Sequence, residues 1–133
     1  MNRKAVLSQT EVQQIIKAAR AEAQANQWAV TIVVVDDGGH PLALERLDGC
    51  APSSAYIATE KARTSALGRR ESKSYEDMVN GGRYAFLSAP VLTSLEGGVP
   101  IVFDGQVIGA VGVSGVKPEQ DAQVAKAGAQ CVK

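Results

Sequence analysis

Apolar residues recur along this chain with two different spacings, and the changes of spacing predict its helices and strands. Helical spacing, with apolar side chains on one face every three or four positions, predicts a helix over residues 8–25. Ser8 and Glu11 at its start match an S-x-x-E capping box, in which each side chain bonds an amide of the first turn. Residues 29–35 are instead apolar on both alternating faces, which indicates a central strand covered on both sides.

A glycine-rich turn follows this strand and carries the only histidine of the chain. Asp37, Gly38, Gly39 and His40 are expected to reverse the chain direction, because glycine accepts positive φ at little steric cost. Residues 41–47 then predict a returning strand with mixed apolar and polar faces. The first half of the chain therefore contains a predicted β-hairpin with His40 at its turn.

The second helix is predicted over residues 53–68, and its apolar positions are small. They form a seam that permits close approach to a sheet and consist of Ala55, Ala58, Ala62 and Ala66. Residues 71–98 are less regular: residues 75–79 favour a short helix, and the glycine pairs at 81–82 and 97–98 predict turns.

The last third predicts a second hairpin and a closing helix. Residues 99–103 and 106–114 flank Asp104-Gly105, the dipeptide that a two-residue type I′ turn favours. Pro118 is expected in the first turn of the closing helix. Two hairpins joined through helices favour an antiparallel α+β sheet over a parallel doubly wound one.

Length and composition limit the class of protein and its partners. The 133 residues suit a single domain that spans the chain, and 14 Lys and Arg balance 14 Asp and Glu, so no net field attracts nucleic acid or an anionic membrane. Neither a membrane-spanning run nor an apolar export segment is found, so we expect a cytoplasmic protein. Cys50 and Cys131 belong to no CxxC pattern and are expected to be free thiols.

Glycines and serines elsewhere in the chain have structural interpretations. The stretch GAVGVSG at residues 109–115 lacks the spacing of a dinucleotide-binding loop, and no phosphate-binding P-loop motif occurs. We favour close packing of a helix on this strand over direct ligand contact. Ser53 and Ser54 stand at a predicted helix start, where serine ordinarily caps the helix.

His40 is open to three interpretations: a turn residue bonded to solvent or backbone, a general base, or an axial ligand of a metal centre. One histidine cannot build a multi-histidine zinc site, whereas a haem needs one protein ligand. Arg46, Asp48, Lys61 and Arg63 are predicted to surround this turn, either as solvated ion pairs or as a clamp for carboxylates such as haem propionates. With 1 Trp, 3 Tyr and 2 Phe, the chain favours a pocket shared between subunits over one inside a subunit.

Three stretches of the chain are found, in the same order, in one known family: VVVDDGGHPLALERLDG, SSAYIATEKARTSA and GGVPIVFDGQVIGAVGVSGVKPEQDAQVAKAG. Through them the chain resembles the GlcG/HbpS-like haem-binding family, which also includes the C-terminal domain of PduO-type proteins. The most specific parts are D-x-G-G-H followed by R-x-D-G, the K-A-x-T of residues 61–64, and the closing glycine-rich run. The matching positions are Gly38, Gly39, Arg46, Asp48, Gly49, Gly97, Gly98, Gly109, Gly112, Ser114, Gly115 and Asp121.

The resemblance implies a profilin-like three-layer α/β/α fold with a five-stranded antiparallel sheet, and it implies homo-oligomers. It also implies haem binding or haem-linked redox sensing, and a link to glycolate metabolism or to cobalamin-dependent diol and glycerol metabolism. On this resemblance we expect haem or another tetrapyrrole as the cofactor, and His40, as the only histidine of the chain, is the candidate metal ligand. The expected cofactor-binding residues are His40, Gly38, Gly39, Arg46, Asp48, Lys61, Gly112 and Ser114.

Three hypotheses of function follow from these observations. The first is a non-catalytic, oligomeric binding protein for a small cofactor. The second is a small accessory enzyme that acts on a hydroxy acid, an aldehyde or a corrinoid, with Asp36, His40 or Lys61 as its acid–base group. The third is an assembly partner of a larger metabolic enzyme.

Overall fold

The computed structural model describes residues 1–133, and its helices and strands follow the predicted order. The elements are α1 (Gln9–Ala25), β1 (Thr31–Asp36), β2 (Pro41–Arg46), α2 (Ser53–Gly68), α3 (Lys73–Asn80), the short 3-10 helix η1 (Tyr84–Ser88), β3 (Gly98–Phe103), β4 (Gln106–Ser114) and α4 (Pro118–Ala129). None of the helices combines the length and the apolar character that crossing a bilayer requires.

The strands form one antiparallel sheet in the order β2-β1-β4-β3. This confirms the predicted α+β class with an antiparallel sheet, but the expected five strands are wrong, because the sheet has 4. The two hairpins supply all of these strands, and the segment between them forms α3 and η1 instead. The fifth strand was implied by the family resemblance alone, and the profilin-like label stays a prediction.

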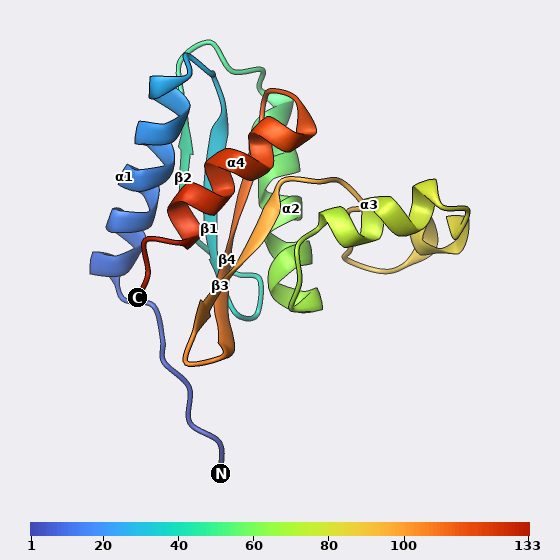
Figure 1. The fold of residues 1–133 in the computed structure, drawn as a ribbon, viewed down its shortest axis with the longest axis horizontal. Coiled ribbons are helices and arrows are strands. Elements are labelled where there is room, and N and C mark those ends of the chain that lie inside the picture. The colour runs from blue at the N-terminus through green and yellow to red at the C-terminus, as the bar shows by residue number, and fades with distance from the viewer.

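Helices cover both faces of the sheet, so the molecule has three layers (Figure 1). On one face, α1 and α4 enclose a core cluster of 17 buried residues that includes Ile15, Ile32 and Val113. On the other face, α2 packs on a cluster of 6 residues, Val33, Val35, Ala58, Ala62, Ala66 and Ala110. The central strand β1 contributes to both clusters, as its two apolar faces predicted.

The structure confirms some of the predicted turns and helix starts and corrects one predicted helix cap. Asp104 and Gly105 both have positive φ, 51° and 72°, as a type I′ turn requires, and α4 begins at Pro118 as expected. The predicted capping box is wrong: the Ser8 hydroxyl donates to the Glu11 carboxylate and makes no bond to a backbone amide. Ser8 is still the residue at which the helix starts.

The segment between α2 and β3 projects from the body as an arm (Figure 1). We use "arm" for residues 71–97, which contain α3 and η1. Tyr75 is the buried residue of α3 and stacks at 5.3 Å between ring centroids on Phe86 of η1. The arm therefore has a small aromatic contact of its own, while its exposed large apolar side chains are Tyr84, Leu87, Val91 and Leu95.

Candidate functional site

The turn between β1 and β2 holds His40 in a defined orientation. One oxygen of the Asp36 carboxylate, Oδ1, accepts hydrogen bonds from the backbone amides of Gly38 and His40, each at 2.9 Å. His40 Nδ1 lies 3.1 Å from the same oxygen. A Cβ at Gly38 would lie 2.9 Å from the imidazole ring, so glycine at this position leaves room for the ring to fold back towards Asp36.

This arrangement decides which ring nitrogen is available. Burial opposes ionisation of Asp36, but the amides of His40 and Gly38 and the His40 ring outweigh it and lower the pKa of the carboxyl. An ionised carboxylate can only accept a hydrogen bond, so Nδ1 donates and a neutral imidazole has its lone pair at Nε2. The imidazole is 80% exposed, and Nε2 makes no hydrogen bond within the chain.

Cationic side chains from α2 lie beside this turn. Arg63 packs its aliphatic part over Gly39, and Arg69 Nη1 donates to the Asp37 carbonyl at 2.6 Å. The Asp37 carboxylate pairs with Lys4, which lowers the pKa of Asp37, and Arg69 adds to this effect. We call this surface, made by residues 36–40 with Arg63 and Arg69, the His40 turn.

Arg46 and Asp48 lie at the other end of the hairpin. Because β2 runs its six residues from Pro41 to Arg46, a rise of 3.3 Å per residue places Arg46 roughly 20 Å from the turn. Arg46 and Asp48 line an open cleft of about 460 Å³ together with Arg20, Glu45 and Trp28. The expectation that one rim joins His40, Arg46 and Asp48 is therefore wrong for a single chain, since an antiparallel hairpin separates its turn from its open end.

Lys61 also lies away from the surface where the sequence placed it. Its ammonium is buried, with Nζ 3.0 Å from Asp121 Oδ2 and donating at 3.0 Å to the Val113 carbonyl. Burial raises the pKa of Asp121, and the Lys61 charge opposes this rise. The buried pair joins α2, β4 and α4, so the predicted position of Lys61 on an exposed rim is wrong.

Two further predicted residues belong to β4, beneath α2. A Cβ at Gly112 would lie 2.1 Å from the Ala58 carbonyl oxygen and 2.5 Å from the Ala62 nitrogen, so the helix backbone occupies this space. Ser114 is buried at the end of the strand opposite Thr31. Gly112 thus serves the close helix packing that we favoured, whereas Gly109 of the same strand lies against Leu7.

The sequence analysis did not select Arg69, and it did not pair Asp121 with Lys61. Arg69 adopts φ of 57° at the end of α2, a position where glycine is common, and the sequence shows no feature that aims its side chain at Asp37. Asp121 is 60 residues from Lys61, and its only sequence feature is its place in the family motif. Serine at the start of α2 was also misread: buried Ser54 bonds Thr31 at 2.7 Å and makes no cap.

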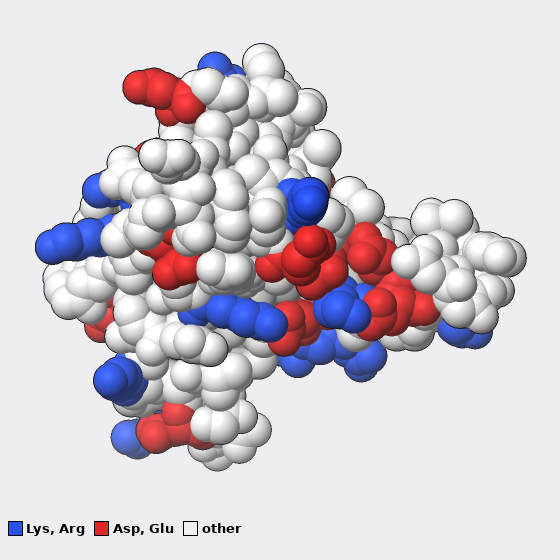
Figure 2. All heavy atoms as spheres, turned by 45° about the horizontal axis from the view of Figure 1, so that its top comes forward, with Lys and Arg blue, Asp and Glu red and all other residues white.

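The chain offers no ready-made metal centre of several ligands. No group of three or more His, Cys, Asp or Glu side chains gathers in a geometry that could hold a metal ion. Cys50 and Cys131 are free thiols, as predicted. Acidic and basic side chains are interspersed on the face seen in Figure 2, in keeping with the balanced net charge. Metal chemistry at the His40 turn would therefore need a metal that brings most of its own ligands.

Comparison with known proteins places these features in a family. GlcG of Escherichia coli strain K12 is 66% identical over 114 residues, which cover 86% of this chain and 85% of GlcG. The crystal structure of Klebsiella pneumoniae protein ORFY superposes with a TM-score of 0.90 at 31% identity and covers 98% of this chain and 95% of ORFY. The crystal structure of the PduOC:heme complex gives a TM-score of 0.87 at 26% identity, over 97% and 96% of the two chains.

The family model described as "Haem degrading protein HbpS-like" matches residues 7–130. This range includes every element of the fold, the His40 turn and the buried Lys61–Asp121 pair. On this match and on the identity to GlcG, the chain belongs to the HbpS-like family.

Proposed function

We propose that this protein binds haem, or a closely related tetrapyrrole, at the His40 turn and acts as a non-catalytic accessory protein. The orientation of His40 by Asp36 carries the proposal, because a histidine that ligates a metal typically donates its other ring nitrogen to a carboxylate or carbonyl. Haem iron needs only one protein ligand of this kind, because the porphyrin nitrogens would supply most of its other ligands.

The surroundings of His40 fit the two chemical parts of a haem. The guanidinium groups of Arg63, which pairs with Glu60, and of Arg69, which bonds the Asp37 carbonyl, have further N–H donors that suit the propionate carboxylates. Leu67 lies one helical turn beyond Arg63 on α2 and is 40% exposed, and Leu42 is exposed just after the turn on β2. These leucines offer apolar contact to the macrocycle, and the relation to PduOC, whose crystal structure is a complex with heme, supports the same cofactor.

The other predicted cofactor residues take different parts in this proposal. Gly38 and Gly39 shape the turn and would contact the cofactor beside His40. Gly112 and Ser114 lie in β4 beneath α2, and Lys61 anchors α2 to β4 and α4, so none of the three would touch the ligand. Arg46 and Asp48 of the same chain are too far from the turn, so they would reach a haem only from a second copy.

We also propose that the protein is a homo-oligomer, in which a second copy covers part of the bound cofactor. An imidazole that is 80% exposed would leave a haem largely in contact with water. The arm adds exposed apolar side chains suited to an interface, with Tyr84 67% and Leu87 68% exposed. A cytoplasmic location fits this proposal, because free thiols such as Cys50 and Cys131 persist in reducing compartments.

Haemin titration tests the cofactor and its ligand together. We expect a saturable shift of the Soret band for the native protein and its loss, or at least a tenfold weaker midpoint, for His40→Ala. Lys17→Ala, which removes an exposed side chain from α1, is the control and should titrate like the native protein. An unchanged titration of His40→Ala would remove His40 as the ligand, and no saturable shift in either protein would end the haem proposal.

Light scattering tests the oligomer. We expect the native mass to be a multiple of 13.9 kDa, and Leu87→Glu, which places a charge on the arm, should lower it. A native protein that runs as a monomer at high concentration with haemin present would contradict a shared site.

A second candidate function rests on the same pair of residues. A carboxylate that orients an imidazole and leaves its second nitrogen free is also the arrangement of a general base. The family description, which refers to haem degradation, and the hydroxy acid, aldehyde or corrinoid substrates considered above define the reactions to try. Turnover of one of these compounds that is lost in His40→Ala would favour the enzyme over the binding protein.

A further inference from the structure

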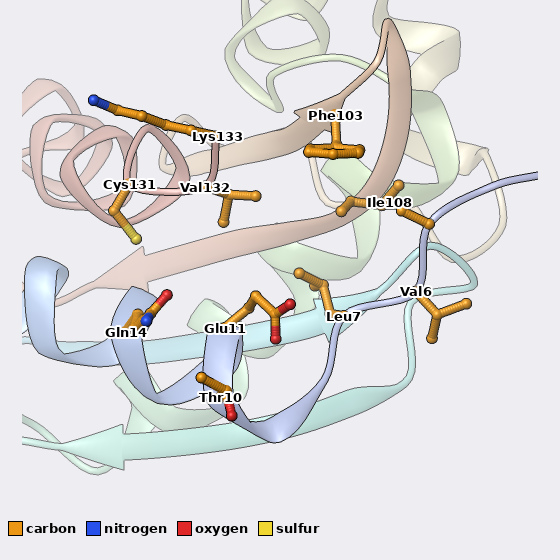
Figure 3. Close-up of a pocket in the computed structure, with 11 residues that line it drawn as sticks. Val6, Leu7, Thr10, Glu11, Gln14, Phe103, Ile108, Cys131, Val132 and Lys133 are labelled. Atoms are coloured by element: carbon orange, nitrogen blue, oxygen red, sulfur yellow. The ribbon is translucent and has the colours of Figure 1, made fainter.

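A separate cavity lies on the α1/α4 side of the sheet and takes no part in the His40 site. It has a volume of about 400 Å³ and lies between residues 5–7, the first turns of α1, the β3–β4 hairpin and residues 131–133 (Figure 3). Pockets that bind small molecules commonly have volumes of about 300 to 1,000 Å³. This cavity therefore has the size of a small-ligand site.

Most of the residues that line the cavity are apolar, and two of them belong to the buried core. Seven of its 11 lining residues are hydrophobic, and Leu7 and Ile108 are themselves almost fully buried. A Cβ at Gly109 would lie 2.8 Å from Leu7 Cδ1 and 2.5 Å from the Val35 carbonyl oxygen, so the bare backbone of β4 lets Leu7 lie against the sheet. The inner part of the wall is thus packed against the core, whereas Val6 at its rim is 82% exposed.

One charged group faces this apolar wall. Figure 3 shows the Glu11 carboxylate pointing from α1 towards the cavity, opposite Val132 and Leu7. Glu11 forms no ion pair in the chain, and the Ser8 hydroxyl bonds Oε2, which leaves Oε1 without a protein partner. The Lys133 side chain, although it lines the cavity, extends away from Glu11 in Figure 3.

The thiol of Cys131 completes the wall without adding charge. Burial raises the pKa of Cys131, so the thiol stays protonated at neutral pH and behaves as a small apolar group. The cavity therefore combines an apolar enclosure with one carboxylate that lacks a cationic partner. A ligand with an apolar body and a cationic head would satisfy both parts, whereas a carboxylate of the same size would be repelled.

We propose that this cavity is a binding site for small apolar amines, with Glu11 as the acceptor for the ammonium group and Leu7, Ile108 and Val132 around the apolar body. The site is separate from the His40 turn and does not require haem. It would allow the protein to carry or sense a small alkylamine or arylamine.

Three probes with one apolar body and different head groups test the proposal: 2-phenylethylamine, 2-phenylethanol and 3-phenylpropanoate. We expect saturable binding of the amine by calorimetry or by NMR shifts of the α1 amides, with at least fivefold weaker binding of the alcohol and none of the carboxylate. Glu11→Gln should weaken amine binding at least fivefold and bring the amine close to the alcohol. Glu22→Gln removes the same charge from the same helix outside the cavity and should leave binding unchanged.

A second variant tests the cavity without changing the charge of Glu11. Val132→Trp places a large side chain in the cavity from the chain end and should abolish amine binding while circular dichroism remains native. Carboxylate binding as tight as amine binding would overturn the proposal. So would an unchanged amine affinity in Glu11→Gln, or no saturable binding of any probe. The haemin titration uses different residues, so either proposal can fail alone.

Discussion

The two faces of the sheet are packed by opposite means, although the same strands supply both. On the α1/α4 face, large branched side chains such as Ile15 and Ile32 fill the space between the layers. On the α2 face, alanines and a glycine bring the helix backbone against β4, so that Gly112 meets Ala58 directly. The first face can adjust through side-chain rotamers, whereas the second has backbone against backbone and little freedom to adjust.

The α2 face also contains the buried ammonium group of Lys61. The Lys61 ammonium lies beside Gly97, where a Cβ would be 2.8 Å from Nζ, and the Lys61 backbone carbonyl lies against Gly98. Small residues therefore make two things possible on this face: close helix packing and a buried ion pair with Asp121. The His40 turn lies at the edge of the same face, where Arg63 and Arg69 leave α2.

Removal of the buried charge should have the largest effect. Lys61→Met leaves the Asp121 carboxylate buried without its cation, and breaking such a pair typically costs about 3 to 5 kcal/mol. We expect a loss of about 4 kcal/mol in the free energy of unfolding, measured by urea denaturation. The double variant Lys61→Met with Asp121→Leu removes both charges and should regain much of this loss.

The exposed pair of Lys73 and Asp77, joined at 2.7 Å on α3, is the control for this experiment. Lys73→Met should cause little measurable change, because exposed ion pairs contribute weakly. If Lys61→Met unfolds at the same urea concentration as Lys73→Met, the buried pair does not stabilise the fold.

Addition of a methyl group beneath α2 should come next in size. A Cβ at position 112 would be only 2.1 Å from the Ala58 carbonyl oxygen, and a backbone atom cannot rotate away. We expect Gly112→Ala to cost about 3 kcal/mol, the upper part of the usual range for overpacking, again by urea denaturation.

Gly128→Ala in α4 is the matched substitution on the α1/α4 face. Its added Cβ would meet the Ile15 carbonyl oxygen at 3.1 Å and Ala19 Cβ at 3.2 Å, which a small shift relieves. Alanine is also favoured over glycine inside a helix by about 1 kcal/mol, so Gly128→Ala should be close to neutral. Equal losses for the two glycine variants would contradict the contrast between the faces.

These differences explain which parts of the fold the sequence predicted. The β1 strand and the Asp104-Gly105 turn depend on neighbouring residues, so periodicity and turn chemistry located both. The partnership of Lys61 with Asp121 spans 60 residues and depends on how α2 and α4 meet, which no local pattern records. Lys61 was therefore predicted to be exposed, because lysine side chains usually lie at the protein surface.

The position of the His40 turn was predicted better than the residues around it. His40 and its glycines were selected correctly as one turn, because their order in the sequence is their order in space. Arg46 and Asp48 were added by proximity in sequence, although the hairpin itself carries them roughly 20 Å away. The Glu11 cavity was not predicted, since it joins residues from both ends of the chain.

Neighbouring residues of β1 allow a smaller test of the same contrast. Ile32 faces the α1/α4 layer and Val33 faces α2, and both are fully buried. Ile32→Val removes one methylene from the adjustable face and should cost about 1 kcal/mol. Val33→Ile adds one methylene against the close-packed helix and should cost about 2 kcal/mol, by urea denaturation. A reversed order would mean that α2 has more room than its alanines indicate.

The smallest effect is expected at the exposed edge, in the His40 turn. The folded protein holds the pKa of Asp36 below its value in the unfolded chain, so between the two values the unfolded state binds more protons. The stabilisation from Asp36 is therefore present above about pH 4 and is lost as the pH falls further, towards the folded pKa. Because the side chain is 34% exposed, we expect less than about 1 kcal/mol. The difference in unfolding free energy between the native protein and Asp36→Asn should shrink from neutral pH to about pH 3, and a constant difference would show that the turn holds His40 without using the charge of Asp36.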